Sequence, residues 1–204
     1  MPRENVYFPV FESTPSNHIS PSFLDSFRRC LQTIQEQYPP GVLVTASRIP
    51  HSYCGDLPFD LDEQEERQAW DFLRQIILVY PKPTIAFING PAVGMVFLLA
   101  LYHDFRVQVR SGASLSMREG PFAANVNPRI GILRAILPCS WLSSSRLTNG
   151  KPLDANESLK RGLIDKIGHI ETVFKIIEDQ ELLRVVKTAD FREKRGLGAR
   201  PFVY

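Results

Sequence analysis

The sequence lacks several features that would assign it to a common class of protein. Its 24 Lys and Arg residues nearly balance its 22 Asp and Glu residues, so no strong overall charge indicates nucleic acid as a partner. Its three cysteines are an odd number without metal-ligand spacing, a pattern typical of buried thiols in a reducing compartment. We therefore expect no metal site and no nucleic-acid partner.

Recognisable targeting signals are also missing. The N-terminal segment 1–9 has no apolar core long enough for a secretory signal peptide. The C-terminal residues 200–204 do not match the Ser-Lys-Leu type of peroxisomal address. We expect a soluble intracellular protein, cytoplasmic or peroxisomal, that does not associate with a membrane.

The central part of the chain contains a long uncharged stretch. No charged residue occurs between Lys82 and His103, a distance of about 20 residues, which is the length of a membrane span. The run Asn-Gly-Pro at 89–91 interrupts it, and this combination is typical of a turn rather than a helix interior. We therefore predict a buried strand at 84–88, a tight turn, and a buried helix from about Gly94. The N–H groups at such a helix start favour a negative oxygen, so the turn is a candidate oxyanion site.

Helices and strands alternate along the rest of the chain. This order is typical of an α/β protein with a parallel sheet, and the strand at 41–46 is apolar enough to be buried on both faces. We predict one domain over residues 1–187 and a C-terminal tail at 188–204. Predicted strands lie at 6–11, 41–46, 84–88, 104–109 and 113–116, and further predicted helices lie at 21–38, 62–80, 130–137, 154–161 and 172–186.

Several motifs in this order resemble those of the crotonase superfamily, the enoyl-CoA hydratases and isomerases. The similar segments are 41–46 with 52–57, 82–107, 113–119 and 147–165, and the resemblance extends over about residues 7–170. It implies a crotonase-like (ClpP/crotonase) α/β fold, in which ββα units repeat in a spiral of packed sheets with surrounding helices.

The resemblance also implies a chemistry. Members of this superfamily polarise an acyl-CoA thioester carbonyl with two backbone N–H groups, and carboxylates then move protons. Coenzyme A would be part of the substrate, with no separate cofactor. By motif position, the resemblance places the two N–H donors at Cys54 and Met95, and substrate contacts at Tyr53, Gly94, Leu98 and Phe122.

Glu119 falls where the superfamily has the second of its two catalytic glutamates. Its apolar sequence neighbours would raise the pKa of the carboxyl toward that of a useful base. The alternative is a surface glutamate paired with Arg118. Leu98 occupies the position of the first glutamate, so the site resembles those with a single carboxylate. One base can move a proton from C2 to C4, which favours a Δ3,Δ2-enoyl-CoA isomerase that converts 3-enoyl-CoA to 2-enoyl-CoA.

Two other patterns have a functional and a structural interpretation. Cys54 is a candidate nucleophile, but a buried thiol that contributes its backbone is the alternative that we favour. His103 and Asp104 look like a catalytic pair, but adjacent residues on a helix end or a strand do not face each other. We therefore expect capping or buried hydrogen bonds from these two residues.

Two other classes of function are compatible with the sequence. One is a different crotonase reaction on an acyl-CoA, by a hydratase, decarboxylase or thioesterase in a specialised pathway. The other is a non-catalytic protein of the same fold that binds or assembles with a partner, which Arg118 and Met95 favour because they depart from the family pattern. The resemblance further implies fatty acid metabolism and a homo-oligomer, most simply a homotrimer.

Overall fold

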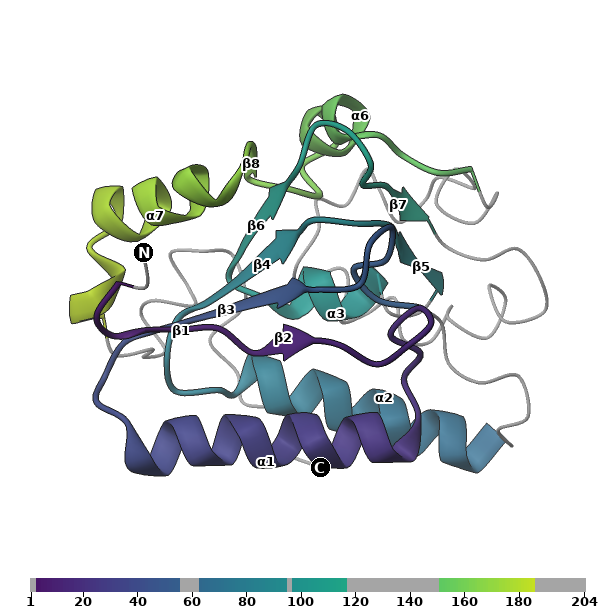
Figure 1. The fold of residues 1–204 in the computed structure, drawn as a ribbon, viewed down its shortest axis with the longest axis horizontal. Helices are drawn as coiled ribbons and strands as arrows, with labels where there is room; N and C mark the ends of the chain where they lie inside the picture. Colours follow the sequence, from purple (N-terminus) through teal and green to yellow (C-terminus); the bar gives the residue numbers. More distant parts are fainter. Residues whose placement is uncertain (1–2, 56–62, 95–96, 117–150, 186–204) are drawn as a thin grey trace.

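The computed structural model describes residues 3–55, 63–94, 97–116 and 151–185 (Figure 1). Met95, Glu119, Phe122, the predicted helix 130–137 and the predicted tail 188–204 lie outside these residues. The strands are β1 (Val6–Tyr7), β2 (Val10–Phe11), β3 (Val42–Ser47), β4 (Thr84–Ile88), β5 (Ala92–Val93), β6 (Phe105–Gln108), β7 (Leu115–Ser116) and β8 (Lys166–Ile167). The helices are α1 (Pro21–Gln37), α2 (Glu63–Leu78), α3 (Phe97–Tyr102), α6 (Ala155–Lys160), α7 (Ile170–Asp179) and the 3₁₀ helix η3 (Leu182–Arg184).

A parallel sheet lies at the centre of the fold. Its strands follow the order β1-β3-β4-β6-β8, and β2 also pairs with β3. Every residue of β3 is buried, and its side chains alternate between two hydrophobic clusters. Leu43 belongs to the first cluster, whereas Val42 and Val44 belong to the second. The prediction of a parallel strand that is buried on both faces is therefore confirmed.

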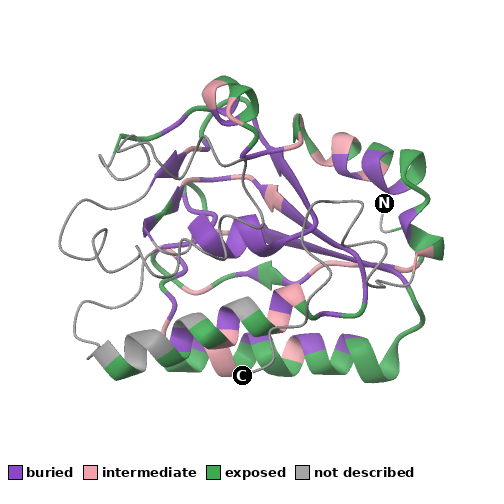
Figure 2. Ribbon diagram, turned by 180° about the vertical axis from the view of Figure 1, so that it is seen from behind, coloured by how far each residue is buried: buried purple, intermediate pink, exposed green. Residues whose placement is uncertain are grey.

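Helices cover both faces of this sheet. The first cluster joins the sheet to α1, α2 and α3, which contribute Phe27, Leu73 and Leu99 among others. The second joins the opposite face to α7 through Val173 and Ile177. Figures 1 and 2 show α1 and α2 side by side on one side of the sheet and α7 on the other. The predicted α/β class is confirmed.

The ends of α1 follow from its sequence. The Ser20 hydroxyl accepts a hydrogen bond from the Phe23 N–H at 3.2 Å, and this N-cap confirms the predicted start. The Lys82 ammonium donates to the carbonyls of Tyr38 and Pro39 just beyond the other end of the helix, at 3.1 and 2.7 Å. Burial lowers the pKa of this ammonium.

A second, smaller sheet is formed by residues that come after the carboxyl ends of β3, β4 and β6 in the sequence. It consists of β5 and β7, and single bridges add Cys54 beside Ala92 and Leu153 beside Leu115. A long strand, a short strand and a helix thus follow one another in β4-β5-α3, and β3, Cys54 and α2 repeat that order. This is the ββα repeat that the resemblance implies.

The sequence analysis missed β5, which lies between β4 and the predicted helix start near Gly94. The Ala92 N–H donates to the Ser114 carbonyl at 2.8 Å, and the Val93 N–H donates to the Cys54 carbonyl at 3.4 Å. These bonds attach β5 to the neighbouring turns. The described helix α3 covers residues 97–102, and none of the described helices is long and apolar enough to cross a membrane.

The C-terminal half of the described chain joins the same sheet through β8, which pairs with β6. Asp154 caps α6 by accepting the Glu157 N–H at 2.8 Å, and Gly162 follows the helix with φ +69°, as predicted. The helix predicted at 172–186 is present as α7 but ends earlier than predicted. Glu181 adopts a left-handed conformation with φ +48° and separates α7 from η3.

Candidate functional site

The turn at residues 52–55 lies against β5, and this contact brings two predicted site segments together. Cys54 forms a parallel bridge with Ala92, two residues before Gly94. Gly94 is buried and has φ +72°, a conformation that favours glycine. The backbone of Cys54 therefore lies beside the strand that leads directly into Gly94.

The N–H groups of this turn have different partners. The Tyr53 N–H donates to the Pro91 carbonyl at 2.8 Å, and the Gly55 N–H donates to the Asn17 carbonyl at 3.2 Å. The Cys54 N–H donates to the same Pro91 carbonyl oxygen at 3.4 Å, a longer bond. Both neighbours of Cys54 are thus held by shorter backbone hydrogen bonds than Cys54 itself.

Asn17 fixes this turn from the opposite side. Its side chain is completely buried, and its amide nitrogen lies 2.8 Å from the Ser47 hydroxyl and 3.3 and 3.2 Å from the carbonyls of Ser52 and Tyr53. Its amide oxygen accepts the Ser13 N–H at 2.8 Å. The sequence analysis missed Asn17. The signal available was weak, because asparagine in an irregular segment more often stabilises only its own turn.

The turn after β4 is attached both to the end of β3 and to the turn at residues 52–55. The Asn89 side chain accepts the Ser47 N–H at 3.0 Å and donates to the Ser47 carbonyl at 2.7 Å, so it substitutes for a neighbouring strand. Next to it, a Cβ atom on Gly90 would lie 2.7 Å from the Ser52 carbonyl carbon and from the Tyr53 nitrogen. Only glycine permits this approach of the two backbones.

The Tyr53 side chain, a predicted substrate contact, lies in the core. It is 0% exposed, its ring packs edge-on against Phe11 at 5.6 Å, and its hydroxyl lies 2.7 Å from the Thr45 hydroxyl. Burial raises the pKa of this hydroxyl well above its usual range, so the group remains protonated. Tyr53 therefore connects the turn to the interior of the sheet.

Gly94 and Leu98 are the other described residues among the predicted substrate contacts. Leu98 lies on α3, is 5% exposed, and belongs to the cluster between the sheet and its helices. At this position the structure has an almost buried hydrocarbon side chain. It contains no group that could hold a proton or a water molecule.

The Cys54 thiol is buried, as the favoured interpretation expected. It is 0% exposed, and its sulfur lies 3.5 Å from the Asn17 carbonyl oxygen, to which it donates. A nucleophile needs a thiolate that substrate can reach. The structure therefore favours a structural role for the thiol.

His103 and Asp104 have separate partners, which confirms the structural interpretation of this pair. The His103 imidazole lies 2.8 Å from both the Thr45 hydroxyl and the Leu99 carbonyl oxygen. The Asp104 carboxylate accepts the N–H and the hydroxyl of Thr84 at 2.8 and 2.9 Å. The imidazole thus bonds to β3 and α3, whereas the carboxylate holds the start of β4.

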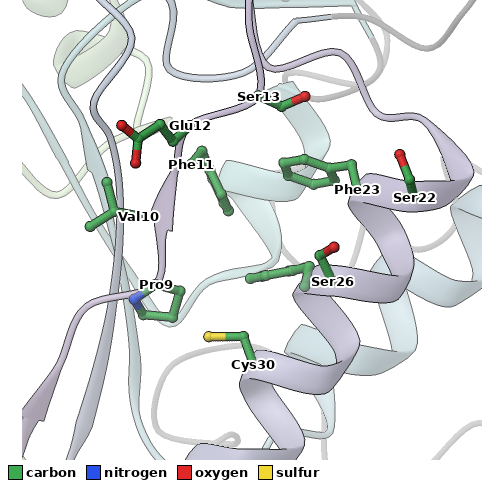
Figure 3. A pocket seen from close by; sticks show the side chains of 10 residues that line it. Pro9, Val10, Phe11, Glu12, Ser13, Ser22, Phe23, Ser26 and Cys30 are labelled. Carbon is green, nitrogen blue, oxygen red and sulfur yellow. The ribbon is translucent and has the colours of Figure 1, made fainter.

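Two hollows occur at α1. The first, about 320 Å³, lies between β2 and α1, where Figure 3 shows Phe11 facing Phe23 and Cys30 pointing toward Pro9. The second, about 430 Å³, lies between α1 and α2 and includes Phe72 and Tyr80. Within the described residues, no group of three or more His, Cys, Asp or Glu side chains could hold a metal ion.

Comparison with known proteins places this geometry in a defined structural class. No protein-family model matches the chain. The structure resembles an enoyl-CoA hydratase from Bacillus anthracis with a TM-score of 0.71, at 23% identity, over 95% of this chain and 78% of that one. It also resembles Pseudomonas aeruginosa DspI with a TM-score of 0.73, at 17% identity, over 96% and 77% of the two chains. The chain has the crotonase fold.

A curated relative adds similarity in sequence. The enoyl-CoA isomerase/hydratase fer4 of Mycosarcoma maydis is 27% identical over 185 residues, which cover 80% of this chain. The chain spans 65% of the length of that relative. The resemblance to the crotonase superfamily, and within it to enoyl-CoA hydratases and isomerases, is therefore confirmed in both sequence and fold.

We expect Gly90→Ala to disturb the turn at 52–55 selectively. The added methyl group would displace backbone, and overpacking of this kind costs about 1–3 kcal/mol of folding free energy. The measurement is amide hydrogen exchange by NMR, in which the Tyr53 N–H should lose protection. Gly112→Ala is the control. Its φ of +77° would also strain an alanine, but beyond its chain neighbours no atom of the described residues lies within 4 Å of the added Cβ, so no backbone would be displaced. Equal Tyr53 protection in both variants would show that the approach of Gly90 does not hold the turn.

Proposed function

We propose that the protein is a Δ3,Δ2-enoyl-CoA isomerase that converts 3-enoyl-CoA to 2-enoyl-CoA with Glu119 as its single base. The observation that carries this proposal is the backbone bridge between Cys54 and Ala92, two residues before Gly94. The bridge joins the turn that carries Cys54 to the strand before Gly94, and the resemblance implies that N–H donors come from these two parts of the chain. Similarity to an enoyl-CoA isomerase/hydratase supports the choice of an acyl-CoA thioester as substrate.

The proposed site works by stabilising an enolate. A proton on the carbon next to a thioester is too weakly acidic for an isolated carboxylate to remove. The N–H groups of Cys54 and Met95 would bind the thioester oxygen as it becomes negative, and one such donor contributes about 3–4 kcal/mol to the transition state. The support for Cys54 is the bridge that places its backbone beside Ala92, two residues before Gly94.

Glu119 would carry one proton through the whole cycle. Its carboxylate takes a proton from C2 of the 3-enoyl thioester, and the electron pair of that C–H bond forms a dienolate. The resulting carboxylic acid then returns a proton to C4, which places the double bond between C2 and C3. No water, cofactor or second acid is consumed.

Leu98 is the residue that favours isomerisation over hydration. A hydratase must hold a water molecule against C3 and take its proton, a task that two carboxylates share in the resembled superfamily. Leu98 stands at the position of one of them and is an almost buried hydrocarbon. It can neither bind that water nor accept its proton, so protonation of the dienolate at C4 is the favoured outcome.

The proposal extends to assembly and metabolism by analogy with the superfamily. We propose a homotrimer that acts in fatty acid metabolism, with the acyl-CoA thioester as its small-molecule partner. A hydratase is the second candidate, because the similar structure from Bacillus anthracis is an enoyl-CoA hydratase.

We expect Glu119→Gln to lower turnover of 3-enoyl-CoA by at least about a hundredfold, the usual contribution of a general base. Thioester binding and the fold should be retained, because the amide has nearly the same shape. The matched control is Glu36→Gln, an exposed residue of α1, which should leave turnover unchanged. Steady-state kinetics on both variants test the assignment. Full activity of Glu119→Gln would remove Glu119 from the mechanism.

Product analysis separates the two candidate reactions. Wild-type protein incubated with 3-enoyl-CoA should yield 2-enoyl-CoA with little 3-hydroxyacyl-CoA, and it should hydrate added 2-enoyl-CoA slowly. Leu98→Glu should gain only slight hydration, because two close carboxylates disturb each other's pKa. Hydration by wild type at a rate comparable to isomerisation would contradict the isomerase assignment. Failure to bind any coenzyme A thioester would instead identify a non-catalytic protein.

A further inference from the structure

A chain of buried side-chain hydrogen bonds connects the turn at 52–55 to α3. The Tyr53 hydroxyl lies 2.7 Å from the Thr45 hydroxyl, and that hydroxyl lies 2.8 Å from Nε2 of His103. Nδ1 of His103 lies 2.8 Å from the carbonyl oxygen of Leu99 on α3. The three side chains come from the turn, from β3 and from the residue just after α3, which is 58 residues from Thr45.

An arrangement of protons with a neutral His103 ring satisfies this chain. The Leu99 carbonyl can only accept, so Nδ1 of His103 carries a proton. In the neutral ring, Nε2 then accepts from the Thr45 hydroxyl, and the Thr45 oxygen accepts from the Tyr53 hydroxyl. In this arrangement each of the three hydrogen bonds has one donor and one acceptor. The arrangement also has a direction, from the turn toward α3.

Burial makes these hydrogen bonds strict constraints on geometry. Tyr53, Thr45 and His103 are each 0% exposed, so water cannot substitute for a partner that moves away. The Tyr53 ring is further confined by Phe11. A shift of the turn relative to α3 would therefore break a buried hydrogen bond or stretch it.

We propose that Tyr53, Thr45 and His103 act as positioning residues that set the distance between the Cys54 N–H and the segment entering α3. The inference rests on the proposed function. Tyr53 is covalently next to Cys54, and α3 follows β5 and Gly94, so the chain spans the two segments that would hold the thioester oxygen. None of the three side chains touches substrate. A displacement of about 1 Å in such a site can cost about a hundredfold in rate.

Tyr53→Phe tests this inference, because it removes one hydroxyl and leaves Thr45 bonded to His103. Tyr80→Phe is a closely matched control, since Tyr80 is 3% exposed and its hydroxyl donates to the Leu31 carbonyl at 3.0 Å, between α2 and α1. Both variants lose one buried tyrosine hydrogen bond, so thermal unfolding should report comparable losses of stability. Only Tyr53 is linked to the turn that carries Cys54.

Two readouts distinguish positioning from stability. Tyr53→Phe should lower kcat for 3-enoyl-CoA by about tenfold with little change in KM, a loss smaller than the hundredfold of a full displacement. It should also reduce the red shift in absorption of a conjugated enoyl-CoA on binding, because that shift measures polarisation of the thioester carbonyl. Tyr80→Phe should retain the wild-type kcat and the full red shift.

Substitutions of Thr45 provide a second, independent test. Thr45→Val keeps the shape of the side chain and removes both hydrogen bonds, so its red shift should fall at least as far as that of Tyr53→Phe. Thr45→Ser keeps the hydroxyl and should restore most of the wild-type shift. If Thr45→Val does not fold, Tyr53→Phe and Thr45→Ser still decide the question.

Each outcome has one meaning. Equal kcat and red shift in wild type and Tyr53→Phe would overturn the positioning role while leaving the proposed function intact. Equal losses in Tyr53→Phe and Tyr80→Phe would also overturn it, because general destabilisation would then explain both. No red shift and no turnover in wild type would refute the proposed function, and the positioning role with it.

Discussion

The contact between the turn at 52–55 and the strand β5 is the constraint on which the candidate site depends. Two segments that are far apart in sequence approach so closely that the N–H groups of Tyr53 and Cys54 both donate to the Pro91 carbonyl. Gly90 makes the approach possible because any larger residue would collide with the Ser52–Tyr53 peptide. The parallel sheet places both segments at the carboxyl ends of its strands, and the local contacts then fix their separation.

Polar side chains hold this arrangement from two further directions. Asn17 and Asn89 bond to backbone groups at residues 47–53, where they replace strand neighbours that the turn lacks. The chain through Tyr53, Thr45 and His103 attaches the turn to the interior. Backbone N–H groups serve as oxyanion donors only when they are rigid, because their value lies in being oriented before the reaction starts. A turn fixed on three sides meets that requirement.

Much of the fold could be predicted from the sequence, because apolar spacing and capping residues have local causes. Ser20 and Asp154 marked helix starts, and the uncharged run at 84–88 marked a central strand, all as observed. The errors came from contacts that no local pattern records. The strand β5 exists because Ala92 bonds to Ser114. Asn17 bonds to partners 30 to 36 residues away, and the Tyr53 N–H bonds to Pro91. Met95, Glu119 and Phe122 remain predictions from motif position.

The central claim is that the Cys54 and Met95 N–H groups converge on one thioester oxygen. A crystal structure of the protein with a non-reactive acyl-CoA analogue tests it most directly. The account predicts that the analogue's carbonyl oxygen lies within about 3.1 Å of both backbone nitrogens, the usual limit for an oxyanion contact. A carbonyl oxygen bound elsewhere, or contacted by neither nitrogen, would contradict the account.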